Sequence, residues 1–202
     1  MNAATDALIV IDVQNDFCPG GAIAVPGGDQ IIAPINALMT QFSAIVLTQD
    51  WHPSGHSSFA SSHPGKSPYQ VIEMPYGPQV LWPDHCVQGT TGAAFHPDLN
   101  TDAADLILRK GFDARIDSYS AFFENDRSTA TGLEGYLRTR GIMRLTLVGL
   151  ATDFCVRYSA VDAARLGFDV TVLESACRAI DLDGSLADAR AAMRDAGVHL
   201  EA

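Results

Sequence analysis

Short, continuous apolar runs alternate with helical patterns along this chain, and this alternation restricts the fold more than any other feature. The apolar runs cover residues 7–13, 44–48, 106–109, 145–149 and 169–173, with a shorter one at 198–200. Such runs are typical of strands buried on both faces, although a buried helix can show the same pattern. Apolar spacing of three and four residues predicts helices at 29–42, 127–140, 152–166 and 185–196. The glycines placed where helices would end are Gly141, Gly167 and Gly197.

Strand alternating with helix indicates βαβ units. We therefore predict an α/β fold with an open, mostly parallel six-stranded sheet and helices on both faces. Residues 51–100 interrupt the rhythm, because they are rich in Pro, Gly, Ser and His and are too long for a passive connection. We expect a single domain over residues 1–202, with a functional insertion at about 51–100.

Composition and charge exclude several classes of function. The chain has 202 residues and a formal net charge of -11 at pH 7, so its field repels nucleic acid and anionic membrane surfaces. No apolar run approaches the length of a membrane span, and the N-terminus lacks the basic region of a signal peptide. The four cysteines are scattered without a CxxC pair, which favours a reducing cytoplasm over a disulfide framework. Nothing in the composition fixes an oligomeric state.

Reactive side chains follow the predicted strands. Ligands of an open parallel sheet bind outside the carboxyl ends of its strands. Asp12 follows the first run and Asp50 and His52 follow the second, while Lys110 and Cys155 follow later runs. Each alone has an ordinary explanation as a helix cap, a loop residue, a surface lysine or a small buried hydrophobe. Their convergence on one edge indicates a site.

Three of these residues suit covalent catalysis. Cysteine attacks as a thiolate, and its pKa falls at a helix N-terminus or beside a lysine, two influences that we expect at Cys155. Asp12 could accept the thiol proton and later deliver it to a leaving group, while Lys110 would hold the pair electrostatically. The backbone N–H groups of Ala151 and Cys155 lie in the predicted strand-to-helix turn and could stabilise an oxyanion. The pattern predicts acyl transfer through a thioester.

A second group of residues suits a metal ion. In the stretch from Asp50 to His56, Asp50 and His52 point to the same side if the backbone is extended, and Trp82-Pro-Asp-His85 follows later. One carboxylate and two imidazoles can hold a divalent ion with positions left open. The alternative is that these histidines are loop residues with backbone hydrogen bonds. Trp82, together with Phe17, stands beside the reactive motifs and could sandwich a flat ring.

The chain resembles the nicotinamidase/pyrazinamidase branch of the isochorismatase-like cysteine hydrolases. The matching stretches occur in the family's order over nearly the whole chain: IDVQNDF at 11–17, TQDWHP at 48–53, HSSFA at 56–60, WPDHCV at 82–87, KG at 110–111, DSYSAFF at 117–123 and GLATDFCV at 149–156. The resemblance implies a Rossmann-like sheet and a catalytic triad of Asp12, Lys110 and Cys155. It also implies a cis peptide bond just before Ala151, which shapes the oxyanion hole.

The resemblance further implies that residues 51–100 are a metal- and substrate-binding insertion. The family binds one divalent ion, for which zinc is the first candidate and iron or manganese are alternatives. The implied metal ligands are Asp50, His52 and His85, with His56 as a fourth ligand in some members. The residues implied to line the substrate ring are Phe17, Trp82 and Tyr119.

The implied reaction is deamidation of nicotinamide to nicotinate and ammonia, a step of NAD salvage, with pyrazinamide as a second substrate. A sister amidohydrolase or isochorismatase would use the same triad on another substrate, but it would not need the metal ligands. A metal-dependent oxygenase would use two histidines and a carboxylate; that reading leaves Lys110 and Cys155 idle. An inactive scaffold would have no reason to keep all three triad positions.

Overall fold

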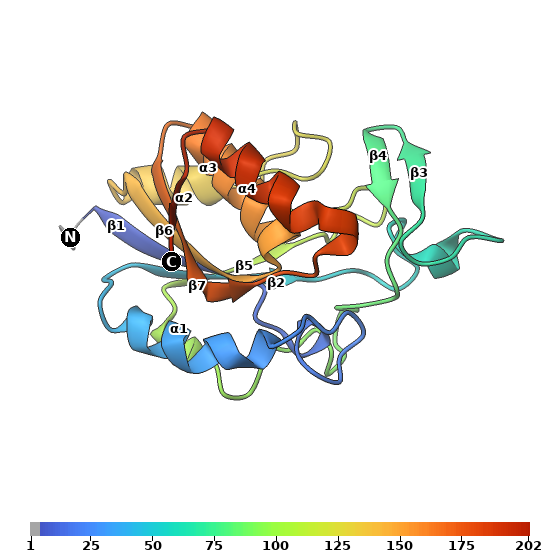
Figure 1. The fold of residues 1–202 in the computed structure, drawn as a ribbon, viewed down its shortest axis with the longest axis horizontal. Coiled ribbons are helices and arrows are strands. Elements are labelled where there is room, and N and C mark those ends of the chain that lie inside the picture. Colours follow the sequence, from blue (N-terminus) through green and yellow to red (C-terminus); the bar gives the residue numbers. More distant parts are fainter. Residues whose placement is uncertain (1–4) are drawn as a thin grey trace.

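The computed structural model describes residues 5–202 and places a parallel sheet between two helical layers (Figure 1). The sheet has six strands in the order β5-β2-β1-β6-β7-β8, and each neighbouring pair is parallel. The predicted α/β fold is therefore confirmed. The strands are β1 (Asp6–Ile11), β2 (Ile45–Asp50), β5 (Leu106–Lys110), β6 (Arg144–Leu150), β7 (Asp169–Arg178) and β8 (His199–Glu201).

Helix α1 covers one face of the sheet, and α2, α3 and α4 cover the other (Figure 1). The helices are α1 (Ile32–Met39), α2 (Leu133–Thr139), α3 (Arg157–Arg165) and α4 (Ser185–Asp195). Each is shorter than predicted. The predicted helix at 127–140 is wrong in its first part, because Gly132 has a φ of 96° and α2 begins only after it. The glycines predicted to end helices have φ values of 71°, 85° and 84°, and these are Gly141, Gly167 and Gly197.

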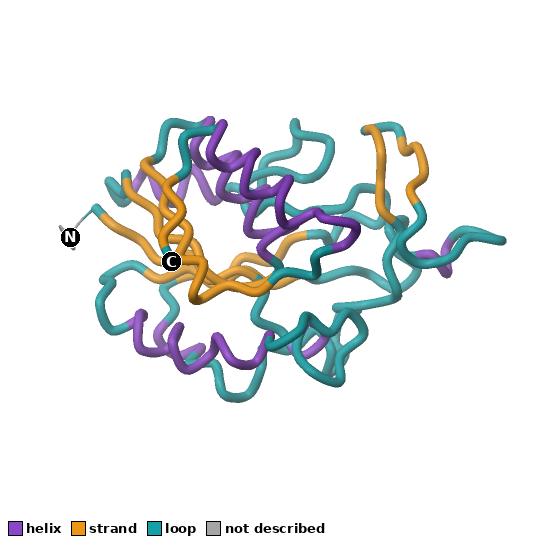
Figure 2. Tube along the Cα trace, viewed as in Figure 1, coloured by secondary structure: helices purple, strands orange, loops and turns teal. Residues whose placement is uncertain are grey.

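The segment between β2 and β5 contains no α-helix and carries a separate antiparallel hairpin of β3 (Val71–Met74) and β4 (Gly77–Val80). Figure 2 shows this hairpin at one end of the molecule, beyond the main sheet. The sequence did not predict the hairpin, because Pro75, Gly77 and Pro78 give it the composition of a loop. Its β3 residues alternate between exposed and half-buried, as expected for a two-stranded ribbon outside the core.

The chain changes direction across the sheet at β1 and β6. From β1 it proceeds outward through β2 to β5, and it then returns to β6 and continues through β7 to β8 on the other side. Ile11 pairs with Gly149 at the carboxyl ends of β1 and β6. Gly149 has a φ of +119°, and a Cβ there would lie 2.1 Å from the Ile11 carbonyl oxygen. This close approach brings the segments that follow the two strands together, at the position where ligands bind in such sheets.

Residues 1–4, on which the signal-peptide prediction partly depends, lie outside the described residues. Within residues 5–202, no helix combines the length and apolar character needed to cross a bilayer.

Candidate active site

The fold brings Asp12, Lys110 and Cys155 together at the carboxyl ends of the strands. Lys110 Nζ lies 2.8 Å from Asp12 Oδ2 and 3.6 Å from Cys155 Sγ. Lys110 ends the edge strand β5, so its long side chain must reach across β2 to meet Asp12 after β1. On the way Nζ also pairs with Asp50 Oδ1 at 2.9 Å and donates to the Ser118 carbonyl oxygen at 2.9 Å. All three candidate catalytic side chains are buried.

Thr48 orients the Asp12 carboxylate, a role that the sequence did not reveal. Its hydroxyl donates to Asp12 Oδ1 at 2.6 Å and accepts from the Asp12 backbone N–H at 3.1 Å. Asp12 has a φ of 48°, in the left-handed region, where Asp is better tolerated than bulkier residues. With Oδ1 held by Thr48 and Oδ2 beside Lys110, the carboxylate has one fixed orientation.

The electrostatics of the group keep a proton on the thiol at rest. Burial raises the pKa of Cys155 well above its ordinary value, and Asp12 and Asp50 raise it further, against the opposing effect of Lys110. Our expectation of a lowered Cys155 pKa is therefore wrong for this resting structure, because burial and the carboxylates outweigh the lysine. Burial also raises the pKa of Asp12, although Lys110 opposes it. Burial alone would lower the pKa of Lys110, but Asp12 and Asp50 raise it well above its usual range.

Cys155 lies in a tight turn between β6 and α3. Residues Thr152–Val156 form one π-helical turn, and α3 begins only at Arg157, so the predicted continuous helix from residue 152 is wrong at its start. The carbonyl oxygen of Ala151 accepts hydrogen bonds from the N–H groups of Phe154 and Val156 at 3.1 and 3.2 Å. The peptide bond between Leu150 and Ala151 is cis, as the family resemblance implied.

Asp50, His52 and His85 form a buried cluster that we call the metal group. Asp50 Oδ2 lies 2.9 Å from His52 Nε2 and 3.2 Å from His85 Nε2. Nδ1 of His52 lies 2.9 Å from the Gly111 carbonyl oxygen, and Nδ1 of His85 lies 2.8 Å from that of Pro83. Because a carbonyl oxygen only accepts, it fixes the proton on Nδ1 and leaves Nε2 free to bind a metal. The donor set therefore fits a divalent ion.

His56 lies next to the metal group but has other partners. Its Nδ1 lies 2.8 Å from Ser58 Oγ, and its Nε2 lies 2.9 Å from the Asp113 carbonyl oxygen. Its ring centroid is 4.3 Å from that of His52, and both could share a second ion-sized space with Asp117. Both ring nitrogens are thus engaged, so binding of the same ion as the metal group would require the His56 ring to leave these partners. Its role as a fourth ligand stays a prediction.

Asp117 is a site residue that the sequence reasoning did not assign. It is buried, and its Oδ1 lies 3.8 Å from His52 Nε2. The same oxygen accepts a hydrogen bond from the Ser118 backbone N–H at 2.8 Å. It also borders the cavity described next. Only its place in the DSYSAFF stretch could have drawn attention to it.

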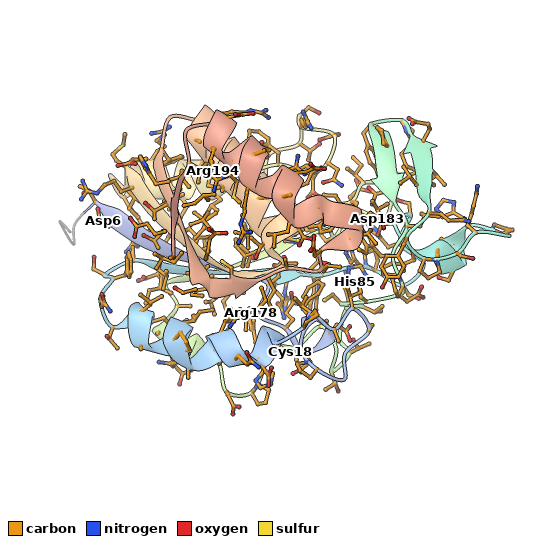
Figure 3. The ribbon with its side chains drawn as sticks, in the orientation of Figure 1. Asp6, Cys18, His85, Arg178, Asp183 and Arg194 are labelled. Atoms are coloured by element: carbon orange, nitrogen blue, oxygen red, sulfur yellow. The ribbon has the colours of Figure 1, made fainter. Side chains whose placement is uncertain are left out.

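One small cavity joins the candidate nucleophile to the metal group. Its volume is about 20 Å³, close to that of a single water molecule, so a substrate ring would have to displace side chains. Trp82 packs edge-on against Phe154 at 4.8 Å and against Tyr119 at 6.3 Å between ring centroids. His85 lies beyond the carboxyl end of the sheet (Figure 3). The lining residues are Phe17, Ile23, Asp50, Trp82, His85, Asp117, Tyr119, Ala151, Phe154, Cys155 and Ile180.

An open parallel α/β sheet with a buried cysteine, acid and lysine at its carboxyl edge defines a cysteine hydrolase, here with a metal-binding group beside it. Comparison with protein families agrees with this class. The model of the isochorismatase domain matches residues 6–201, and the chain belongs to the isochorismatase family.

The similar proteins carry more specific names. A nicotinamidase of Acinetobacter baylyi is 59% identical over 192 residues, which cover 95% of this chain and 90% of that protein. The solved nicotinamidase/pyrazinamidase of Acinetobacter baumanii is 56% identical with a TM-score of 0.98, covering 100% of this chain and 97% of that one. The pyrazinamidase of Pyrococcus horikoshii, solved in complex with zinc, is 36% identical with a TM-score of 0.76, covering 96% and 97%.

Proposed function

We propose that this protein hydrolyses nicotinamide to nicotinate and ammonia, and pyrazinamide to pyrazinoate, as a step of NAD salvage. The observation that carries the proposal is the shared cavity, which is bordered by Cys155 and by Asp50 and His85 of the metal group. A pyridine carboxamide has its ring nitrogen and its amide carbon a short, fixed distance apart. Once side chains have moved to admit the ring, this cavity could therefore hold the nitrogen at one end and present the amide to the thiol at the other. The high identity to a nicotinamidase supports this choice of substrate.

In the first half of the reaction, Asp12 takes the proton of the Cys155 thiol as Sγ attacks the carboxamide carbon. The tetrahedral intermediate then collapses as its C–N bond breaks, and Asp12 returns the proton to the departing ammonia. Water adds to the resulting thioester and gives one proton to Asp12. As the C–S bond breaks, Asp12 passes that proton to the departing sulfur, which regenerates the thiol, and the product loses its own acid proton and leaves as nicotinate. Lys110 offsets the negative charge on Asp12 and on the developing thiolate throughout.

The backbone N–H groups of Ala151 and Cys155 are the proposed oxyanion hole. Both residues line the cavity and belong to the turn that the Ala151 carbonyl oxygen organises. Donors held by a rigid turn need no rearrangement when the oxyanion forms, which is why such groups lower the barrier effectively.

We assign the metal group as the ligands of one divalent ion. The ion would supply a Lewis acid that holds the pyridine nitrogen. Zinc is the first candidate because the Pyrococcus horikoshii relative was solved with it, and iron or manganese suit the same ligands. Phe17 and Trp82 would flank the substrate ring, and Tyr119 would complete the wall beside Trp82.

The proposal includes one domain with a metal- and substrate-binding insertion at about 51–100. This segment contributes His52, Trp82 and His85 to the site, while the remaining residues lie at the carboxyl ends of the strands or in the segments that follow them. A cytoplasmic location agrees with the cysteines, all four of which are free thiols.

The direct test is ammonia release from nicotinamide by the purified protein, before and after chelation. We expect release that chelation abolishes and that metal restores. Metal-loaded protein that releases no ammonia from nicotinamide or pyrazinamide would refute the proposal, and a panel of other amides would then identify the substrate of a sister hydrolase.

A further inference from the structure

Gln79 connects the metal end of the cavity, where Asp117 lies beside His52, with the aromatic wall formed by Trp82 and Tyr119. Its side chain is 1% exposed and projects from β4 of the hairpin. The amide nitrogen Nε2 lies 2.6 Å from Asp117 Oδ2, 2.7 Å from the Val80 carbonyl oxygen and 3.0 Å from the Tyr119 hydroxyl oxygen, so its two hydrogens are shared among three acceptors. We propose that Gln79 is a positioning residue, which fixes the separation between the metal group and the aromatic wall and thereby sets the affinity for the substrate ring. The inference rests on the proposed function.

The orientation of the Gln79 amide is determined by its partners. A carboxylate has only acceptor oxygens, so Asp117 must face the NH2 group. On the other side, the Tyr119 backbone N–H donates to Asn125 Oδ1 at 3.1 Å, which turns Asn125 Nδ2 toward Gln79 Oε1 at 3.2 Å. The Tyr76 hydroxyl donates to the same Oε1 at 3.1 Å. A flipped amide would place its oxygen against the Asp117 carboxylate oxygen and its NH2 group against the NH2 group of Asn125.

Both ends of the cavity depend on this amide. At the ring end, the Tyr119 hydroxyl also accepts from Trp82 Nε1 at 3.0 Å, so the position of the indole is linked to Gln79 through Tyr119. At the metal end, the other Asp117 oxygen lies 3.8 Å from His52 Nε2. Gln79 is thus bonded to one residue of each end, and a buried network of this kind allows few alternative arrangements.

The location of the network explains why rigidity is needed there. A much larger groove of about 730 Å³ lies on its outer side and is lined by Tyr76, Tyr119 and Asn125, among others. Tyr119 therefore has the small cavity on one side and the groove on the other. Without a fixed hydroxyl, its ring would have space to move away from Trp82, and the wall of the cavity would be lost.

The test compares Gln79→Leu with Gln70→Leu. The second variant makes the same chemical change beside the same hairpin, at an exposed glutamine. For Gln79→Leu we expect KM for nicotinamide about tenfold higher or more, the loss that corresponds to misplacing one hydrogen bond to a charged group. The Kd of nicotinate, measured by calorimetry, should rise by a similar factor, while kcat should change less than about threefold. Gln70→Leu should match the wild type in all three.

A purely structural role would lower thermal stability without changing KM or nicotinate affinity in the folded fraction. Tyr119→Phe separates the two cases, because it removes the hydroxyl but leaves the Gln79–Asp117 contact in place. It should raise KM, and the double variant should lose less than the sum of both changes, since the two residues act through one bond. Tyr119→Phe also decides the matter if Gln79→Leu does not fold.

Wild-type KM and nicotinate affinity in folded Gln79→Leu, or in Tyr119→Phe, would overturn the positioning role and leave the proposed function intact. A metal-loaded wild type without activity on nicotinamide or pyrazinamide would instead refute the proposed function itself. Metal content is measured in every variant. A variant that binds less metal, but binds nicotinate with wild-type affinity once it is loaded to the wild-type level, would likewise contradict the inference.

Discussion

Thr48→Val offers a sharp test of the proposed acid–base role of Asp12. The substitution keeps the shape of the side chain and removes the hydroxyl that donates to Asp12 Oδ1 at 2.6 Å. It also leaves the Asp12 backbone N–H without the acceptor that it has at 3.1 Å. Metal ligands are untouched, so an effect on turnover would come from the carboxylate.

The magnitude follows from the charge on the acceptor. A hydrogen bond to a charged group contributes about 1.5–3 kcal/mol, so kcat/KM should fall roughly ten- to a hundredfold. The hydroxyl also lowers the Asp12 pKa, against the burial that raises it. Its removal should therefore raise that pKa further. Because Asp12 must be deprotonated to accept the thiol proton, the acid limb of the kcat/KM profile should move to higher pH by about one to two pH units.

The assay is ammonia release as a function of pH, with Thr146→Val in strand β6, which β1 separates from β2, as the control. Thr146 is half-buried and lies outside the site, so its variant should keep the wild-type profile. An unshifted acid limb in Thr48→Val, with metal content and fold intact, would refute Asp12 as the base that the profile reports.

The other predictions concern the nucleophile, the metal group and the backbone. Cys155→Ala should abolish turnover and keep the metal content of the wild type; substantial residual activity would exclude it as nucleophile. His85→Ala should lower the metal content and weaken nicotinate binding, and an unchanged stoichiometry by elemental analysis would remove it from the metal group. Gly149→Ala should lower the free energy of unfolding by about 3 kcal/mol or more in urea, because its Cβ would meet a carbonyl oxygen of β1 at 2.1 Å. Gly135→Ala, in a helix with open space, is the control and should be neutral or stabilising. Chelation should destabilise the protein more as pH rises. Asp50 raises the pKa of His52 against the effect of burial, so protonated His52 stabilises the metal-free protein at low pH. That contribution is lost as pH rises through the raised pKa. A thermal stability difference between metal-loaded and metal-free protein that stays constant with pH would contradict this.

The sheet could be predicted from the sequence because strands buried on both faces produce continuous apolar runs. The runs located the strand ends approximately, except that β7 continues to Arg178 beyond the predicted end at residue 173. Asp12, Asp50, Lys110 and Cys155 lie at or after the strand ends and therefore had to meet at one edge. Thr48 and Gln79 were not predicted as site residues, because no sequence pattern marks them. Their function lies only in partners that are remote in sequence, and neither residue type indicates a site by itself.

The pKa of Cys155 was mispredicted because local rules considered only its immediate neighbours. A lysine and a helix N-terminus both favour the thiolate. Burial, and carboxylates delivered by two other strands, outweigh them in the folded chain. The direction of a pKa shift in such a site is a property of the tertiary structure.

The charges of the buried groups explain why the candidate catalytic residues and the metal group belong together. Lys110 pairs with both Asp12 and Asp50, so one buried cation faces two buried carboxylates. An uncompensated buried charge is costly, and either a proton or a further cation must offset it. A divalent ion at Asp50 would provide that cation and would leave Lys110 to serve Asp12 and Cys155. In this arrangement the ion would do more than hold a ring: it would complete the charge balance under which Asp12 can remain ionised beside a protonated thiol.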